Sequence, residues 1–445
     1  MRLRHLLLLA LALRLLLPAT AFLVTRDPET FCTPDSYGYL TLAASLVQEG
    51  RYEGPEGLGL FRPPGYPILV ALGALIGHPY LVTILLQALL GLLTVYLTYR
   101  TASLFFGGQR AATFAGLACA CDPLLVAYGS LLLSETLFAA LLTLSALLLL
   151  KYLADRSVRW LVFGAIAVSA CAYVRVIAYF LPVWVAFILA IRGVGTPDRS
   201  RVYAHAALFL GMCVALLGAW QVRNGVTTGY FGFSTQIDRA FYARGKVVAP
   251  RKEPSVRDMV REMSGWVGAG PETPGFSLSR GHAIIRWRGI LWILKSPGAF
   301  ALSNLKGMMV TLLAPAGAEY RVLLGLSPEK LGLLRTIWER GVFGAGLQLA
   351  RIPPVMLWIV VGMGLILLPY LVLPALSLWR MDSAHRIALV VVWTIILYVL
   401  VLSGGHNASA RLRLPAMPLL SMLVGYELSR LRGRNARRSS LAHAR

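Results

Sequence analysis

Residues 33–67 read TPDSYGYLTLAASLVQEGRYEGPEGLGLFRPPGYP and form the first sizeable polar segment after an apolar N-terminus. The segment holds acids, tyrosines, two arginines and two proline-rich turns, and hydrophobic sequence resumes directly after it. Ionisable residues are costly in apolar surroundings and therefore usually mark function there. This stretch predicts chemistry at one face of a membrane.

The composition of the whole chain supports that interpretation. Of 445 residues, 57% are hydrophobic and 14% are charged, whereas soluble domains carry about 25% charged residues. The chain is therefore predicted to be an integral membrane protein. Because one span needs about 20 residues, a bundle of spans uses most of the chain as a single unit, and we expect one all-α transmembrane domain over residues 1–445.

The formal net charge of +23 and the five cysteines narrow the function classes. The basic residues lie in short connections between apolar runs, as expected of loops retained in the cytoplasm, and no nucleic-acid-binding motif accompanies them. We therefore expect no nucleic-acid partner. Four cysteines fall inside apolar runs and Cys32 lies alone in a loop, so neither a disulfide framework nor a cysteine metal site is predicted.

The apolar runs predict about ten to twelve membrane spans. Beyond the N-terminal run, clear ones lie at 80–104, 111–128, 131–153, 160–173, 176–191, 202–220, 355–379, 387–402 and 414–428. Residues 290–313 are interrupted by Ser296-Pro297-Gly298 and fit either a span or an amphipathic helix at the interface. If residues 290–313 cross the membrane, residues 331–350 must cross it in the opposite direction, because the later spans otherwise lose their predicted orientation.

The first apolar run leaves two alternatives open. Its basic start, apolar stretch and small residues at 19–21 fit a cleaved signal peptide. Arg14 interrupts the apolar stretch, and the whole run is about long enough to span. We expect a retained first span.

Charge in the connections predicts the orientation. The connections 100–110, 151–159 and 192–201 are basic, whereas the first loop, residues 26–66, is acidic. The positive-inside rule places the basic set in the cytoplasm and residues 26–66 outside, with juxtamembrane helices. Residues 221–290 then form a long outer loop, and residues 429–445 form a basic cytoplasmic tail.

Two outer motifs hold candidate catalytic residues. Thr33-Pro34-Asp35 is typical of a helix start, so Asp35 is either an acid that stabilises the helix dipole or a rigidly held general base. Prolines after Arg62 stiffen the chain, so that arginine either anchors to lipid or binds one phosphate in a bidentate manner. Glu135 and Arg175 lie at outer span ends within apolar sequence, which favours function over an ordinary interfacial position.

Further polar residues fall on the same predicted face. They comprise two tyrosines of the first loop and four basic residues near later span ends, namely Tyr37, Tyr66, Arg223, His406, Arg411 and Arg413. The middles of the spans are mostly Leu, Ala and Val, whereas a transporter usually carries polar groups or broken helices near the midplane. The one-sided cluster favours an enzyme that acts on an anionic, lipid-linked substrate.

The order of these motifs resembles the GT-C superfamily of polytopic glycosyltransferases. The resemblance rests on Asp35-x-Tyr37, on RPPGYP from Arg62, on SETLF from Ser134, on Val174-Arg175, on residues 220–224 and on RLRLPAMP from Arg411. The chain is most similar to bacterial relatives of the protein O-mannosyltransferases and of the transferase that adds aminoarabinose to lipid A.

This resemblance implies a GT-C-like bundle and an enzyme of the bacterial inner membrane whose active site faces the periplasm or exterior. Its donor would be a sugar on a polyprenyl phosphate of the undecaprenyl type, and its acceptor a lipid, glycan or protein. Asp35 matches the acidic residue expected to act as base, Arg62 lies where the carrier phosphate is bound, and Glu135 matches a second acidic position. No metal ligand or cofactor is assigned, and use of a divalent metal stays open.

The expected reaction is a single displacement with inversion, in which Asp35 accepts the acceptor proton and arginines stabilise the departing phosphate. Two rival functions remain. A lipid-linked glycan polymerase or ligase also needs arginines outside, and a transporter or flippase of an anionic lipid would move its substrate without breaking a bond.

Overall fold

The computed structural model describes residues 1–249, 278–315, 318–323, 325, 336–337, 341, 343–344, 354–405 and 408–443. Within these ranges the protein is helical throughout and has no strand. The first half comprises α1 (Leu3–Thr25), η1 (Pro28–Phe31), α2 (Pro34–Gln48), η2 (Pro55–Gly57), α3 (Leu58–Phe61), α4 (Gly65–Leu75), α5 (Pro79–Phe105), α6 (Gly108–Cys121), α7 (Pro123–Gly129), α8 (Glu135–Asp155), α9 (Val158–Val174), η3 (Val176–Phe180) and α10 (Leu181–Ile191).

The second half comprises α11 (Arg199–Thr228), α12 (Thr235–Lys246), α14 (Leu278–Lys295), α15 (Pro297–Leu313), α16 (Ala318–Leu323), α18 (Pro354–Trp379), α19 (Arg386–Ser403), η4 (Ala410–Ala416) and α20 (Met417–His443). The predicted all-α fold is confirmed. α14 and α15 meet at Ser296, so residues 290–313 are not one helix; Pro297 and Gly298 begin the second helix.

Membrane-crossing length is reached by six helices among the described residues, or by seven if α6 and α7, bent by 51°, form one span. Three apolar helical segments are shorter, namely Gly65–Leu75, Val158–Val174 and Val176–Ile191. The chain is therefore a multi-pass membrane protein. The expected ten to twelve spans stay a prediction, and the alternative crossing at 331–350 falls almost entirely outside the described residues.

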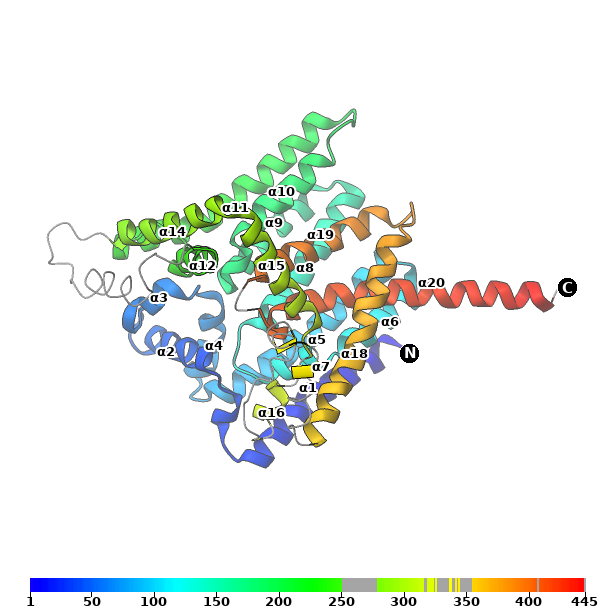
Figure 1. Ribbon diagram of the computed structural model, residues 1–445, viewed down its shortest axis with the longest axis horizontal. Helices are drawn as coiled ribbons and strands as arrows, with labels where there is room; N and C mark the ends of the chain where they lie inside the picture. Colours follow the sequence, from blue (N-terminus) through cyan, green and yellow to red (C-terminus); the bar gives the residue numbers. More distant parts are fainter. Residues whose placement is uncertain are drawn as a thin grey trace.

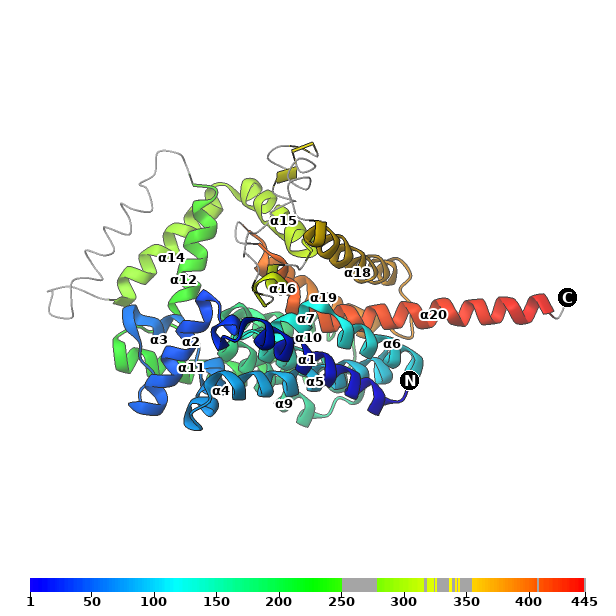
Figure 2. The ribbon, with the colours of Figure 1, turned by 90° about the horizontal axis from the view of Figure 1, so that it is seen from below.

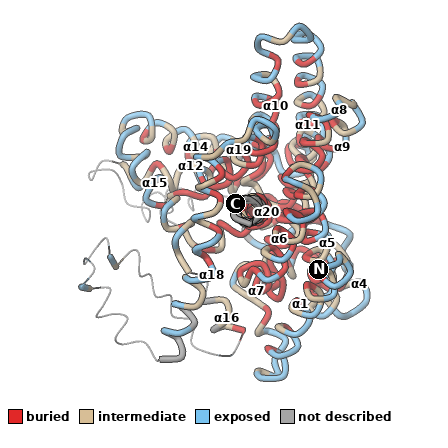
Figure 3. The backbone as a smooth tube through the Cα atoms, turned by 90° about the vertical axis from the view of Figure 1, so that its right-hand side faces the viewer, coloured by how far each residue is buried: buried red, intermediate tan, exposed pale blue. Residues whose placement is uncertain are grey.

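The helices form a bundle with a second layer on one side. Figure 2 shows α12, α14, α15 and α18 lying over the layer that contains α1, α4, α5 and α6. Buried residues gather at the centre of the bundle, whereas the connection between α10 and α11 is exposed (Figure 3). Both termini lie away from α2, α3 and α12 (Figure 1), so the first loop and the termini occupy different ends of the molecule.

The broken pair α6 and α7 depends on an arginine from the first helix. The main-chain oxygens at the end of α6 have no partner within the helix, because Asp122-Pro123 starts α7 in a new direction. Arg14 Nη1 donates to the Ala120 oxygen over 3.2 Å and Nη2 donates to the Cys119 oxygen over 3.4 Å. The Tyr370 hydroxyl donates to the Ala118 oxygen over 2.7 Å. Irregular backbone inside a membrane needs such partners.

Packing around Arg14 shows that this position is built for a long cation. The residue is 2% exposed. A Cβ atom on Gly91 of α5 would lie 2.3 Å from Arg14 Nε, so only glycine leaves room for the side chain. α1 thus packs as part of the bundle, against α5 and α6.

Replacing Arg14 by methionine is expected to destabilise the protein. Arg14→Met keeps much of the side-chain bulk but leaves the Cys119 and Ala120 oxygens without a donor, which costs about 2 kcal/mol of unfolding free energy. Thermal unfolding in detergent measures the effect. The exposed Arg4 on the same helix provides the control variant Arg4→Met. Equal melting temperatures for both variants would contradict the role assigned to Arg14.

Candidate active site

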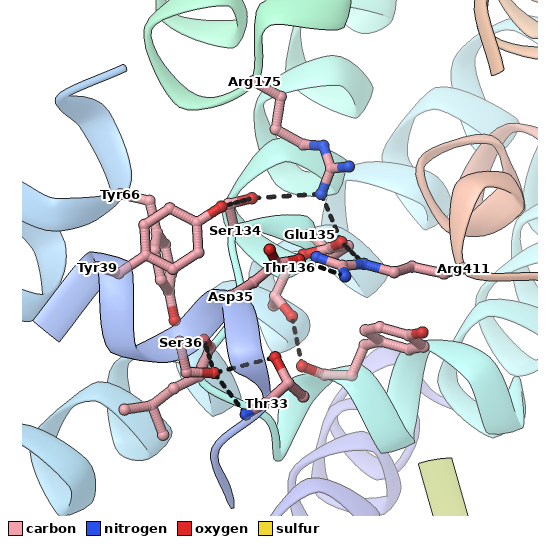
Figure 4. Close-up of polar contacts among 12 residues, drawn as sticks. Thr33, Asp35, Ser36, Tyr39, Tyr66, Ser134, Glu135, Thr136, Arg175 and Arg411 are labelled. Carbon is pink, nitrogen blue, oxygen red and sulfur yellow. Dashed lines mark hydrogen bonds and ion pairs between the residues drawn. The ribbon is translucent and has the colours of Figure 1, made fainter. Parts of the chain in front are cut away.

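Two carboxylates and three arginines meet where several helices begin or end. Asp35 lies in the first turn of α2, Arg62 directly follows α3, and Glu135 begins α8. Arg175 caps the end of α9, and Arg411 lies in η4. Figure 4 shows Arg175 and Arg411 approaching Glu135 from different elements. The structure therefore brings together five of the predicted site residues.

Arg411 joins the two carboxylates. Its Nη1 atom lies 2.6 Å from Asp35 Oδ2, and its Nε donates to Glu135 Oε1. Asp35 Oδ1 also accepts from Arg62 Nη2 over 2.6 Å, and Glu135 Oε1 lies 2.5 Å from Arg175 Nη1. Each acid is thus paired with two arginines, and three cations face two anions.

Neutral side chains complete the network. The Tyr39 hydroxyl accepts from Arg62 Nη1 over 3.2 Å and lies 3.2 Å from Ser134 Oγ. Ser134 Oγ in turn accepts from Arg175 Nη1 over 3.2 Å. The Arg62 guanidinium also stacks over the Tyr39 ring, 4.8 Å from its centroid. Tyr39 therefore connects the Asp35 end of the network with the Glu135 end.

The start of α2 fixes Asp35 in place. Thr33 is the N-cap of the helix, as predicted, and its main-chain N–H donates to Ser36 Oγ over 2.9 Å. Ser36 Oγ then donates to the Leu132 oxygen, just before Glu135, over 2.8 Å. Ser36 is fully buried. The first turn of α2 is thus fastened to the segment that leads into α8.

A close backbone approach holds Arg62 near Arg175. A Cβ atom on Gly65 would lie 2.8 Å from the Tyr173 oxygen and 2.9 Å from Val174 Cγ2. The turn that follows Arg62 therefore contacts the last residues of α9. The Tyr52 hydroxyl fixes the same turn by donating to the Arg62 oxygen over 2.9 Å.

Exposure differs between the two acids. The Glu135 side chain is 0% exposed and that of Asp35 is 35% exposed. Burial by itself raises the pKa of Asp35, but the charges and hydrogen bonds of Arg411 and Arg62 outweigh it and lower the pKa to about 2. Asp35 is therefore an accessible carboxylate, whereas Glu135 is a buried counter-ion.

The other predicted site residues lie around this network. Tyr66 is fully buried and donates to Gln87 Oε1 over 2.8 Å, while its ring packs edge-on against Tyr39. Tyr37 is exposed, and its hydroxyl lies 3.4 Å from Glu29 Oε2. Both tyrosines stay predicted substrate contacts, but the placement of Tyr66 favours support of Tyr39.

Two predicted basic residues bind main-chain oxygens. Arg223 Nη2 lies 3.5 Å from the oxygen of Tyr52, the residue that holds the Arg62 turn. Arg413 is 2% exposed, and its Nη1 donates to main-chain oxygens at the end of α15, over 2.9 Å to Thr311. This placement favours a structural role for Arg413. His406 lies outside the described residues.

Two site features were missed in the sequence. The first is Tyr39, which lies one turn after Asp35 and therefore on the same face of α2. The second is the contact of the Tyr128 hydroxyl with Glu319 Oε1 over 2.6 Å, which fastens α16 to the end of α7. No local pattern pairs residues 191 positions apart.

The donor set does not match a divalent-metal site. Both carboxylates are bound to arginines, and the part of the chain that the structure describes contains no group of three His, Cys, Asp or Glu side chains suited to a metal. Ser36, which follows Asp35, bonds to main chain instead.

Comparison with known proteins adds to this geometry. The whole chain superposes on the archaeal oligosaccharyltransferase AglB from Archaeoglobus fulgidus, in complex with an inhibitory peptide and a dolichol-phosphate, with a TM-score of 0.55 and 13% identity. The apo form of that enzyme matches with a TM-score of 0.53. The fold is that of the GT-C glycosyltransferases. The fold expected from the sequence motifs is thus confirmed.

The superposition covers 100% of this chain but only 51% of the oligosaccharyltransferase, so the chain spans about half the length of that enzyme. Residues 61–220 match the family described as dolichyl-phosphate-mannose-protein mannosyltransferase. ArnT from Cupriavidus metallidurans, bound to undecaprenyl phosphate, is 18% identical with a TM-score of 0.43 over 94% of this chain and 77% of its own. No curated protein sequence matches the chain.

Substitution of Gly65 is expected to loosen the site. Gly65→Ala places a methyl group 2.8 Å from the Tyr173 oxygen, so the Arg62 turn or α9 must move, at a cost of about 1–3 kcal/mol. Gly211→Ala in α11 is the matched control, because no atom lies within 4 Å of its Cβ position. The melting temperatures of the two variants are measured in detergent and compared. A Gly65→Ala variant as stable as the control would contradict the close approach.

Stability should depend on pH through Asp35 in a defined direction. A carboxyl whose folded pKa is depressed to about 2 stabilises the fold above its unfolded pKa, about 3.9, and loses this contribution as the pH falls toward 2. The melting-temperature difference between native protein and Asp35→Asn should therefore be the same at about pH 7 and pH 5 and should shrink below about pH 4. If the melting temperatures of the two proteins were already equal at pH 5, the pairing of Asp35 with Arg62 and Arg411 would be contradicted.

Proposed function

We propose that the protein is a membrane glycosyltransferase that moves a sugar from a polyprenyl phosphate carrier to a lipid, glycan or protein acceptor. The observation that carries the proposal is the convergence of Arg62, Arg175 and Arg411 on only two carboxylates at one end of the bundle. Three clustered guanidinium groups suit a phosphate, which they bind in a planar, bidentate manner. The GT-C fold supports the same reaction class.

The arginines have the geometry required to stabilise a leaving phosphate. They are held by carboxylates, by Tyr39 and by Ser134, so little reorganisation is needed when negative charge develops. Their side chains are between 14% and 25% exposed, so each is partly buried yet reaches the surface. A donor whose prenyl chain lies in the bilayer would present its phosphate to them at the membrane boundary.

Asp35 is the proposed base because it is the accessible acid of the network. The acceptor oxygen attacks the anomeric carbon, its proton passes to an Asp35 oxygen, and the bond between that carbon and the phosphate oxygen breaks with its electron pair on the phosphate. One displacement of this kind inverts the anomeric configuration. Glu135, which is fully buried, serves to position Arg175 and Arg411.

The proposed sidedness follows from charge. Basic residues of α20 lie with other connections at the end opposite the site: Arg430 Nη1 donates to the Arg380 oxygen between α18 and α19 over 2.8 Å, and Arg432 stacks on Phe114 of α6. The positive-inside rule places that end in the cytoplasm and the arginine network outside. For a bacterial protein this face of the inner membrane is the periplasm or exterior.

A transfer assay tests the function. Purified full-length protein is incubated with polyprenyl phosphate carriers of labelled sugars and with membrane acceptors. Native protein should yield labelled product, and Asp35→Asn should lower the rate by about 10²-fold or more, the scale of a lost general base. Asp198→Asn, an exposed acid in the connection before α11, is the matched control and should keep full activity.

The rival functions give different results in the same assay. A product that grows by repeated addition would indicate a glycan polymerase or ligase. Labelled lipid that crosses vesicles equally well with native protein and Asp35→Asn, without a new bond, would overturn the transferase proposal and indicate a flippase.

A further inference from the structure

Asp35 occupies the arginine donors that a phosphate needs. Its Oδ1 atom is bound to Arg62 and its Oδ2 atom to Arg411, both over 2.6 Å. Apart from these bonds, Arg62 donates to the Tyr39 hydroxyl and Arg411 to Glu135. One carboxylate therefore bridges the two arginines and binds one Nη atom of each.

Of the two acids, Asp35 is the one able to give way. Glu135 is fully buried at the start of α8 and is fixed by two arginines, and exposing or unpairing such a charge is costly. Asp35 is 35% exposed, and the main chain beneath it is held independently by Ser36 and Leu132. Rotation of its side chain releases both arginines without moving α2.

We infer that Asp35 and the donor phosphate are alternative ligands of Arg62 and Arg411, so that donor binding displaces the Asp35 carboxylate and thereby frees it to act as the base. This inference rests on the proposed binding of a prenyl-linked phosphate at the arginines. A sugar phosphodiester carries one negative charge, as does the carboxylate it replaces, so the exchange keeps the charge balance around the arginines.

The exchange resolves a conflict in the proposed chemistry. A carboxylate held by two arginines, with its pKa lowered to about 2, is a weak base. Once the phosphate has taken the arginines, the pKa of Asp35 rises toward its ordinary range, about 3.9, and the carboxylate accepts a proton more readily. Base strength therefore develops only when the donor is bound.

The same competition acts on the product. After transfer the carrier is a phosphate monoester with a charge of about −1.5 to −2, and Asp35 carries the acceptor proton. When Asp35 loses that proton to solvent, it again competes for Arg62 and Arg411 and promotes release of the monoester. A variant that lacks the carboxylate should hold the monoester more tightly.

Binding of farnesyl phosphate, a short prenyl phosphate monoester, tests the inference without any transfer step. Titration of the purified full-length protein in detergent, followed by calorimetry, should give about tenfold tighter binding for Asp35→Asn than for native protein. Asp198→Asn should bind as native protein does. Farnesol, which lacks the phosphate, should bind all three proteins equally, because it does not compete with a carboxylate.

Further variants separate competition from damage to the site. Asp35→Glu retains a carboxylate and should bind farnesyl phosphate no more tightly than native protein, and Asp35→Ser should repeat the gain if the asparagine variant does not fold. Equal or weaker binding by both Asn and Ser variants would overturn the inference and leave the transferase proposal standing. If no protein binds the phosphate, the arginine site itself, and with it the proposed function, is wrong.

Discussion

The site depends on the two ion pairs that Arg411 makes, one with Asp35 and one with Glu135. One guanidinium joins Asp35 to Glu135, across 376 and 276 positions of the sequence respectively. It thereby ties the first loop, the start of α8 and the segment before α20 to one point. Because Glu135 is a fully buried charge, it requires its two arginines, and removal of a partner from such a buried pair typically costs about 3–5 kcal/mol.

The same residue type has two different functions in this chain. Arg14 and Arg413 are buried against main-chain oxygens at helix ends, where they replace hydrogen bonds that a broken helix lacks. Arg62, Arg175 and Arg411 are bound to carboxylates and stay partly exposed. Neutral acceptors fix an arginine permanently, whereas an acidic partner can be exchanged for another anion. The partners distinguish structural arginines from those suited to phosphate.

Helix ends explain why the site lies where it does. The five charged members of the network all lie at a helix terminus or in a short connection, so each of these side chains leaves its element where the chain turns. Gly65 and Ser36 fasten two of these turns to their neighbours by contacts that few other residues allow. The helices and the tight turns at their ends hold the three arginines close together. In a flexible loop, repulsion between their like charges would move them apart.

Hydrophobic runs predicted the membrane class and the all-α fold, and the Thr33-Pro34-Asp35 motif predicted the start of α2. Ionisable residues at the predicted outer span ends indicated the members of the acidic and basic cluster. These features are local, because helix periodicity, capping and the cost of charge in lipid act within a few residues. Which arginine meets which acid, the buried position of Tyr66 and Arg413, the role of Tyr39 and the link from Arg14 to the end of α6 were decided by the tertiary structure. They depend on packing between elements far apart in the chain, for which a single sequence carries no distance information.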